Sequence, residues 1–455
     1  MKIYIDKDKK YQTFDGFGAS GAWWAQEVGG WTHIDEKSGT PVRDRISELL
    51  YNKEKGIGLR TYRYNIGAGS KYSENSKIDN PLRKTESFGN GDGNYDFGRD
   101  VNAVYMMKQA VKDGAEEVVF FVNSPLEQFT KNHKAHCDKS KMFQDNLSKK
   151  NYVPFMKYCL DVTEHFIKEG VPIKYLSPVN EPFWIWDGGQ EGCHYHPKSC
   201  SNLFSLFADE MDKRPAFDHV KLSGFENGDI RWFNKSYTRN LFKYENVRKR
   251  VDSVDYHSYF LFQPIYPSFM KKRIPYLKRF RKYMDKHYQG IDVKMSEWCH
   301  MEDGRDKTMR SALVMANVMY EDLAILNVSS WNHWIAVSEV DYCDGLIYIN
   351  MEDKSFELTK RLFATGNFSK YIPYGAVRVE AKCDDTELKL LAFAKDDKTV
   401  LIVINDTEQE KSVSLDESIK DIALVVTNEE DDLKEYKIEN ADIKISAKSV
   451  NTIIF

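Results

Sequence analysis

The stretch Ile173–Pro182 reads IKYLSPVNEP, a short apolar run that ends in the polar pair Asn180 and Glu181. Upstream of it, apolar residues recur at helical spacing, at Phe155, Cys159, Val162 and Phe166. This order predicts an amphipathic helix that covers a sheet, followed by a buried strand of that sheet. The stretch is therefore typical of one unit of an α/β fold.

The same alternation of apolar run and helical segment extends from about residue 15 to about residue 335. Eight runs carry it: Phe14–Ala22, Ile57–Ile66, Glu117–Asn123, Ile173–Asn180, Val220–Phe225, Val251–His257, Ile291–Glu297 and Val328–Trp334. Eight strands that alternate with helices predict an α/β protein with a (β/α)8 TIM barrel.

The C-terminal part has a different pattern. Short alternating runs such as LKLLAFAKDD and KTVLIVIND are separated by acidic turns, which predicts an antiparallel β-sandwich. The opening run KIYIDKDK is too short to fold alone, so we expect it to pair with this sandwich. The predicted divisions are residues 1–14 for the N-terminal strand, 15–365 for the barrel and 366–455 for the sandwich.

Composition excludes several classes of partner. The chain has 455 residues with 65 Lys+Arg and 69 Asp+Glu, a net charge of −4, which argues against a nucleic-acid partner. No window approaches the roughly 20 apolar residues of a membrane span, and the N-terminus lacks the apolar stretch of a signal peptide. These features favour a cytoplasmic protein, unless a signal peptide has been removed. Seven scattered cysteines suit reduced thiols, and the oligomeric state stays open.

Two glutamates end apolar strands of the predicted barrel, where active sites of this fold lie. Glu181 follows the fourth run, and Glu297 ends the seventh, IDVKMSE. A single glutamate at such a place could merely cap a helix or pair with arginine. Two that face each other suit hydrolysis of an acetal, because one donates a proton while the other stays ionised near the anomeric carbon.

Four motifs then carry a resemblance: Thr13–Trp24 (TFDGFGASGAWW), Asn180-Glu181-Pro182, Ser296-Glu297 and GNFSKYIPYGAVRV at 366–379. Together they resemble glycoside hydrolase family 30, a family of retaining β-glycosidases in clan A, over nearly the whole chain. The resemblance implies that Glu181 is the general acid/base and Glu297 the nucleophile. It implies no cofactor and no metal.

The resemblance extends to four further residues of the barrel. It implies that Asn180 binds the sugar 2-hydroxyl, and that Arg63 in TYRYNIG holds Glu297 ionised. His257 and Tyr259 in DYHSYF match the His-x-Tyr pattern of the clan, with the tyrosine hydroxyl near the nucleophile. A satisfied core histidine remains the alternative for His257.

Loops at the strand ends bear on the substrate. Trp334 in WNHW matches the aromatic floor under the sugar, although Trp331 is an alternative for that place. Gln128 stands where the family commonly has a tryptophan, so we expect it to change which hydroxyls are recognised. The segment GGQEGCHYHP, which follows Trp184 and Trp186, and the segment RYNIGAGS are similar to the endo-β-1,6-galactanase branch. Trp184 is itself a candidate for stacking on a sugar.

These features predict a retaining β-glycosidase that acts on short, imported β-linked oligosaccharides of the galactan type, with β-1,6 linkage as one possibility. The alternatives are an exo-acting β-xylosidase, β-glucosidase or β-fucosidase of the same family, and a carbohydrate-binding barrel without turnover. A binding protein has no need of both glutamates together with Asn180 and Arg63, which argues against the last.

Two loops are rich in metal-binding side chains, namely His133, His136 and Cys137 after the third run, and Cys193, His194 and His196 after the fourth. Neither has the paired short spacing of a zinc finger. Isolated loop residues are therefore the expectation, with a zinc site or a contact between Cys137 and Cys193 as alternatives.

Overall fold

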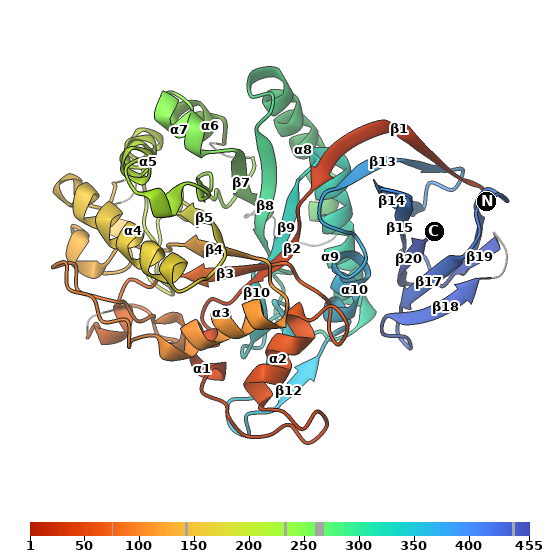
Figure 1. The fold of residues 1–455 in the computed structure, drawn as a ribbon, viewed down its shortest axis with the longest axis horizontal. Coiled ribbons are helices and arrows are strands. Elements are labelled where there is room, and N and C mark those ends of the chain that lie inside the picture. The colour runs from red at the N-terminus through yellow and green to blue at the C-terminus, as the bar shows by residue number, and fades with distance from the viewer. Residues whose placement is uncertain (75, 142–143, 232–233, 260–267, 439–441) are drawn as a thin grey trace.

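Eight parallel strands form a closed barrel at the centre of the molecule (Figure 1). The computed structural model describes residues 1–455 except 75, 142–143, 232–233, 260–267 and 439–441. The strands pair in the order β6-β5-β4-β3-β2-β9-β8-β7. Their bounds are β2 Gly16–Ser20, β3 Thr61–Asn65, β4 Glu117–Phe121, β5 Ile173–Ser177, β6 Lys221–Leu222, β7 Ser253–His257, β8 Asp292–Trp298 and β9 Ser330–His333. Each predicted run coincides with one of them, although β8 extends one residue beyond its run, to Trp298, so the predicted barrel is confirmed.

The barrel closes between the segment after β6 and strand β7. The N–H of His257 donates to the carbonyl of Asn227 at 2.7 Å, and Asn227 bridges to Tyr256 in parallel. Since β6 itself has two residues, the chain beyond it completes the barrel wall. Closure in this way leaves the end of β6 next to the end of β7.

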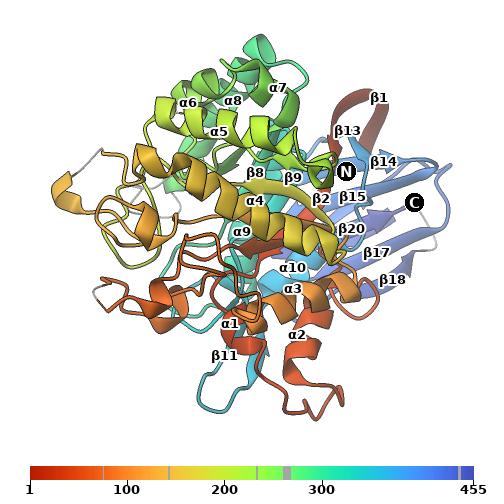
Figure 2. The ribbon, with the colours of Figure 1, turned by 60° about the vertical axis from the view of Figure 1, so that its left-hand side comes forward.

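Helices cover the outside of the barrel (Figure 2). Their bounds are α1 Ala25–Val28, α2 Val42–Tyr51, α3 Val101–Asp113, α4 Tyr152–Lys168, α5 Pro197–Met211, α6 Asn234–Leu241, α7 Glu245–Arg250, α8 Ser268–His287, α9 Met309–Glu321 and α10 Lys360–Ser369. In α4 the predicted apolar positions, Phe155, Cys159, Val162 and Phe166, are all buried. The 3.6-residue period therefore identified the face that packs on the sheet.

A second domain lies beside the barrel and is built from a seven-stranded antiparallel sheet of order β1-β13-β14-β15-β20-β17-β18 and a two-stranded sheet, β16-β19 (Figure 1). The bounds are β1 Ile3–Phe14, β13 Ala376–Cys383, β14 Leu388–Lys395, β15 Lys398–Asn405, β16 Lys411–Ser414, β17 Ile422–Thr427, β18 Lys434–Ile438, β19 Asp442–Ile445 and β20 Ser449–Ile454. Strand β1 pairs with β13, as predicted for the N-terminal run.

The two faces of the seven-stranded sheet pack against different parts of the protein, and alternate side chains of one strand reach each of them. On β15, Leu401 and Val403 face the small sheet, whereas Val400, Ile402 and Ile404 join the core of the barrel. Helix α10 lies between the domains, where the Asn367 amide donates to the carbonyl of Val425 at 3.1 Å. The two domains therefore share one continuous apolar contact.

Beyond β9 the chain forms a small sheet of β10 Ile335–Ser338, β11 Gly345–Ile349 and β12 Phe356–Leu358, which the sequence patterns did not predict. All seven cysteines are free thiols. Among the described residues, no helix combines the length and apolar character needed to cross a bilayer.

Candidate active site

Glu181 and Glu297 meet at the carboxyl ends of the barrel strands. Glu297 lies in β8, and Glu181 follows β5 in a left-handed backbone conformation with φ +41°. The N–H of Glu181 donates to the carbonyl of Glu226 at 2.8 Å, which helps to hold this turn. One oxygen of each of the two glutamates and a nitrogen of His257 all lie within 4.8 Å of one another. This approach is closer to the carboxyl separation of about 5–5.5 Å in retaining glycosidases than to the roughly 6.5–9.5 Å of inverting ones.

His257 lies between three carboxylates and is fully buried. Its Nδ1 donates to Glu181 Oε1 at 2.7 Å and lies 3.4 Å from Glu297 Oε1, while its Nε2 donates to Glu226 Oε2 at 3.0 Å. Burial alone lowers the pKa of His257, but the charge of Glu297 and the hydrogen bonds to Glu181 and Glu226 raise it to about 10. Carboxylate oxygens at both ring nitrogens are what a doubly protonated imidazolium requires.

Glu226 is a member of the site that the sequence interpretation missed. It follows β6 with φ +49° and is fully buried. Its Oε2 accepts from the hydroxyl of Ser296 and lies 3.5 Å from Arg63 Nη2. Burial raises the pKa of Glu226, yet the charge of Arg63 and the bond from His257 together lower it to about 2. A glutamate one residue beyond the fifth apolar run was the signal available in the sequence.

Arg63 and Tyr259 hold the second carboxylate. Arg63 Nη1 donates to Glu297 Oε2 at 3.2 Å, and its guanidinium lies 4.4 Å from the centre of the Phe121 ring. The Tyr259 hydroxyl donates to Glu297 Oε1 at 3.0 Å. Burial raises the pKa of Glu297, while the charges of His257 and Arg63 act in the opposite direction. Both oxygens of Glu297 are thus directed by neighbouring side chains.

A cavity of about 860 Å³ opens above the two glutamates. Aromatic side chains contribute much of its wall: Trp23, Trp184, Trp186, Tyr259, Trp334 and Tyr342. Trp331 is instead buried in the barrel and donates from Nε1 to Asp322 Oδ2 at 3.1 Å, so Trp334 is the one on the cavity. Aromatic rings around a pair of carboxylates suit the apolar faces of sugar rings.

Two further residues predicted for the site, Asn180 and Gln128, lie in different surroundings. Asn180 is buried beside Glu181, and its Oδ1 has no partner within the described part of the protein. Gln128 lies in the short turn Glu127–Phe129 and is exposed, and it is not among the described residues that line the cavity. The recognition role expected of Gln128 therefore has no support from its position.

A family model described as "O-Glycosyl hydrolase family 30" matches residues 1–348, and "Glycosyl hydrolase family 30 beta sandwich domain" matches residues 375–453. The chain belongs to glycoside hydrolase family 30. As a member of this family, the protein is a retaining O-glycosyl hydrolase, which agrees with the short gap between its two glutamates.

Relatives of this family 30 hydrolase differ in their printed activities. An endo-beta-1,6-galactanase of Hypocrea rufa is 26% identical over 281 residues, and the match spans 55% of each chain, so about half of that relative is covered. A conserved exported protein from Bacteroides fragilis has a similar structure, with a TM-score of 0.88, 23% identity and full coverage of both chains. The catalytic domain of GH30 xylanase C from Talaromyces cellulolyticus gives a TM-score of 0.75 at 16% identity, with 100% and 99% coverage.

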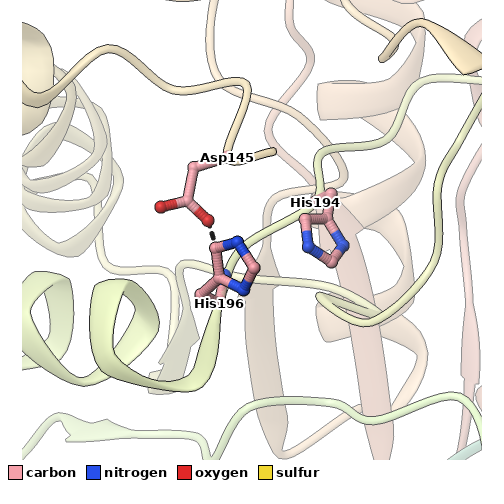
Figure 3. Close-up of side chains that lie close together, drawn as sticks. All are labelled: Asp145, His194 and His196. Atoms are coloured by element: carbon pink, nitrogen blue, oxygen red, sulfur yellow. Dashed lines mark hydrogen bonds between the residues drawn. The ribbon is translucent and has the colours of Figure 1, made fainter. Parts of the chain in front are cut away.

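Among the described residues, the histidine and cysteine side chains of the two loops after β4 and β5 do not form one metal-binding cluster. His194 and His196 approach Asp145, and their ligand atoms lie within 4.8 Å of one another (Figure 3). The Asp145 carboxylate also accepts from the N–H of His196 at 2.5 Å and from the hydroxyl of Ser199, so it caps the start of α5. The other loop contributes Cys137, whose Sγ accepts from the N–H of His194 at 3.2 Å.

Cys137 and Cys193 are in contact, which was one of the alternatives predicted from the sequence. The two side chains are hydrogen-bonded to each other, which lowers the pKa of Cys137, whereas burial raises the pKa of Cys193. The pair connects the loop after β4 to the loop after β5. The backbone of the same loop also holds Trp186, whose carbonyl accepts from the N–H of Cys137 at 2.8 Å.

Proposed function

We propose that this family 30 hydrolase cleaves β-linked galacto-oligosaccharides by double displacement, with Glu181 as acid/base and Glu297 as nucleophile. The observation that carries the assignment is the approach of the Glu181 and Glu297 oxygens to within 4.8 Å on the floor of an aromatic cavity. The galactan substrate is supported by the endo-beta-1,6-galactanase relative and by the loop after Trp184.

In the first step, Glu181 donates a proton to the glycosidic oxygen, and the bond from that oxygen to the anomeric carbon breaks with its electron pair on the oxygen. A Glu297 oxygen forms a bond to the anomeric carbon from the other face, which gives a glycosyl ester. Arg63 and Tyr259 orient the attacking carboxylate, because each donates to one of its oxygens. The alcohol or sugar that leaves carries the proton from Glu181.

In the second step, water attacks the anomeric carbon and Glu181 accepts its proton. The bond to Glu297 breaks, and this carboxylate is regenerated. Two inversions give net retention of the β configuration. His257 donates a hydrogen bond to Glu181 at 2.7 Å, so it orients this carboxyl group in both steps.

The barrel order separates the two ends of the substrate. β9, which leads to Trp334, is four strands away from β5, which leads to Glu181, in a ring of eight. Because Glu181 protonates the leaving group, the leaving sugars lie along Trp184 and Trp186 on the β5 side. The glycone then lies over Trp334 and Trp23, whose rings pack edge to face at 5.0 Å.

The test is a panel of β-1,6-galacto-oligosaccharides of increasing length, beside aryl β-galactoside, β-glucoside, β-xyloside and β-fucoside, with products followed by chromatography. The proposal expects cleavage of the galacto-oligosaccharides. Cleavage of another sugar series alone would refute the galactan substrate and leave the catalytic assignment standing. Release of single sugars alone would mean exo action.

A further inference from the structure

Asp145, His194 and His196 form a group of potential metal ligands outside the active-site cavity. One carboxylate oxygen and one nitrogen of each imidazole all lie within 4.8 Å of one another (Figure 3). None of the three is among the described residues that line the cavity. The proposed double displacement makes no use of them, so their proximity has no explanation in the catalytic chemistry.

The fold brings the three ligands together from two neighbouring loops. Asp145 lies in the loop after β4, and the two histidines lie in the loop after β5, and these strands pair in parallel. The N–H of Asn146 donates to the carbonyl of His194 at 3.4 Å, so the two loops run side by side next to the ligands. The arrangement is therefore set by the backbone.

The two histidines reach the same side of their segment. His196 has an extended backbone, with φ −67° and ψ 153°. Alternate side chains of an extended segment share a side. Tyr195, between the histidines, is buried, and its N–H donates to the carbonyl of Pro182 at 2.9 Å. The sequence His-Tyr-His thus places two imidazoles beside Asp145.

A backbone carbonyl orients the buried histidine. His194 Nδ1 lies 3.2 Å from the carbonyl oxygen of Phe183, which only accepts, so Nδ1 carries the hydrogen. In the neutral ring, the lone pair is then on Nε2. Histidines that bind a metal are commonly oriented by such a bond from the other ring nitrogen. His194 therefore has the tautomer that a metal ligand requires.

The Asp145 carboxylate brings a negative charge to these rings. It accepts from the N–H of His196 at 2.5 Å and from the hydroxyl of Ser199, and each oxygen keeps a further lone pair. Lys131 Nζ donates to the backbone carbonyl of Asp145 at 2.6 Å rather than to its carboxylate. The charge of Asp145 also offsets the positive end of α5, which by itself disfavours a cation nearby.

The donor set suits zinc. Imidazole nitrogens and carboxylate oxygens bind Zn²⁺ at about 2.0–2.2 Å, whereas Ca²⁺ and Mg²⁺ prefer oxygen ligands. Ligand atoms on one Zn²⁺ lie within roughly 4 Å of one another, so the spacing needs only a small movement of the exposed His196 ring. We propose that Asp145, His194 and His196 bind one Zn²⁺ ion, with water at the fourth position.

The ion has a structural role. It joins the loop after β4 to the loop after β5, and the second of these carries Trp184 and Trp186 on the cavity wall. The Phe183 carbonyl, to which His194 is bound, comes one residue before Trp184. Zinc therefore stabilises this part of the wall. The proposal depends neither on the substrate nor on the roles of the two catalytic glutamates.

The test measures binding of Zn²⁺ to the EDTA-dialysed chain by competition with a chromophoric chelator, in the Glu181→Gln variant. This background disrupts the other described group of ligand atoms, Glu181, His257 and Glu297. We expect one Zn²⁺ per chain, with a Kd in the micromolar range or lower. His196→Gln and Asp145→Asn should each weaken binding at least tenfold, since even a residue that only orients a ligand commonly contributes this much.

His133→Asn is the matched control for the loss of a histidine. His133 is exposed in the same loop as Asp145 and belongs to neither group of ligand atoms. Asparagine also suits its left-handed φ of +53°. Zn²⁺ should bind this variant as tightly as the parent. Equal affinity of His196→Gln and the parent overturns the proposal, and so does the absence of a micromolar site in the parent.

A role of Asp145 as a helix cap alone is the competing explanation. His196→Gln separates the two roles, because it keeps the backbone N–H that Asp145 accepts. Without zinc, the Tm of this variant should equal that of the parent, and with zinc only the parent should gain. Amide exchange followed by mass spectrometry should slow at 144–147 and 183–196 in the parent alone. A gain in Tm shared by both proteins, or slower exchange confined to other segments, would contradict the zinc site.

Discussion

Glu226 accepts a hydrogen bond from Nε2 of His257 at 3.0 Å, on the edge of the imidazole opposite to Glu181. Because Glu226 is buried and also lies 3.5 Å from Arg63, it connects the histidine at the proposed acid/base to the arginine at the proposed nucleophile. The protonation of one proposed catalytic carboxyl and the orientation of the other therefore depend on the same buried residue.

Replacing Glu226 by Gln tests this connection. The change removes a negative charge beside His257 and lowers the pKa of the imidazolium, so the basic limb of the kcat/KM profile moves to lower pH, by about one unit or more. The measurement is the pH profile on an aryl glycoside. Glu321→Gln is the control, since Glu321 is buried and pairs with Arg273 at 2.8 Å away from the cavity. A basic limb that stays in place would show that Glu226 has only a packing role.

Stability should fall at high pH because of His257. Its pKa is raised from 6.5 to about 10 in the folded protein, so its contribution is complete below pH 6.5 and is lost as the pH rises through 10. Urea unfolding of wild type and His257→Gln at pH 6 to 10 measures this contribution. The difference between the two proteins should shrink with rising pH. A constant difference would mean that His257 does not carry the shifted charge.

The contribution of Glu226 to stability should depend on pH in the opposite direction from that of His257. Its pKa is lowered from 4.5 to about 2, so its contribution is present above pH 4.5 and is lost as the pH falls toward 2. Thermal unfolding of wild type and Glu226→Gln between pH 3 and 7 should converge at the acid end. Parallel curves across this range would contradict the ionised state of Glu226.

Glu181→Gln should separate substrates by their leaving groups. A poor leaving group needs the proton from Glu181, so hydrolysis of oligosaccharides should slow by about 10²- to 10⁴-fold. An activated aryl glycoside needs little protonation and should form the glycosyl ester at a rate close to that of wild type, measured as a burst. Equal loss of this step on both substrates would argue against the acid role.

Trp334 and Trp184 should differ in the substrates they affect. Trp334→Ala removes the proposed floor under the reacting sugar, so kcat/KM should fall about tenfold or more on every substrate. Trp184→Ala should impair long oligosaccharides and leave aryl glycosides nearly unchanged. Steady-state kinetics on both substrate types provide the comparison. The same loss on all substrates in both variants would contradict the division of the cavity into two ends.

The barrel was predictable because each of its strands corresponds to a short apolar run in the sequence. The run Ile291–Glu297 becomes β8, and the helical spacing of Phe155 and Cys159 becomes the buried face of α4. The proximity of Glu181 and Glu297 was predictable because polar residues that end apolar strands of a barrel meet at one end. These inferences require only short stretches of sequence.

The missed residues depend on contacts between distant segments. Glu226 follows a strand of two residues and enters the site through a left-handed turn, and neither feature produces a periodic pattern. The choice between Trp331 and Trp334 required the position of Asp322, which is bound to Trp331 in the barrel interior.

The most direct test of the catalytic assignment is the anomeric configuration of the glycosyl azide that each alanine variant makes from an activated aryl β-glycoside and sodium azide, read by proton NMR. In Glu297→Ala, azide occupies the place of the proposed nucleophile and should give the α-glycosyl azide. In Glu181→Ala, azide attacks the glycosyl ester on Glu297 and should give the β-glycosyl azide. The reverse pair of products, or rescue of neither variant in a folded protein, would contradict the roles proposed for Glu181 and Glu297.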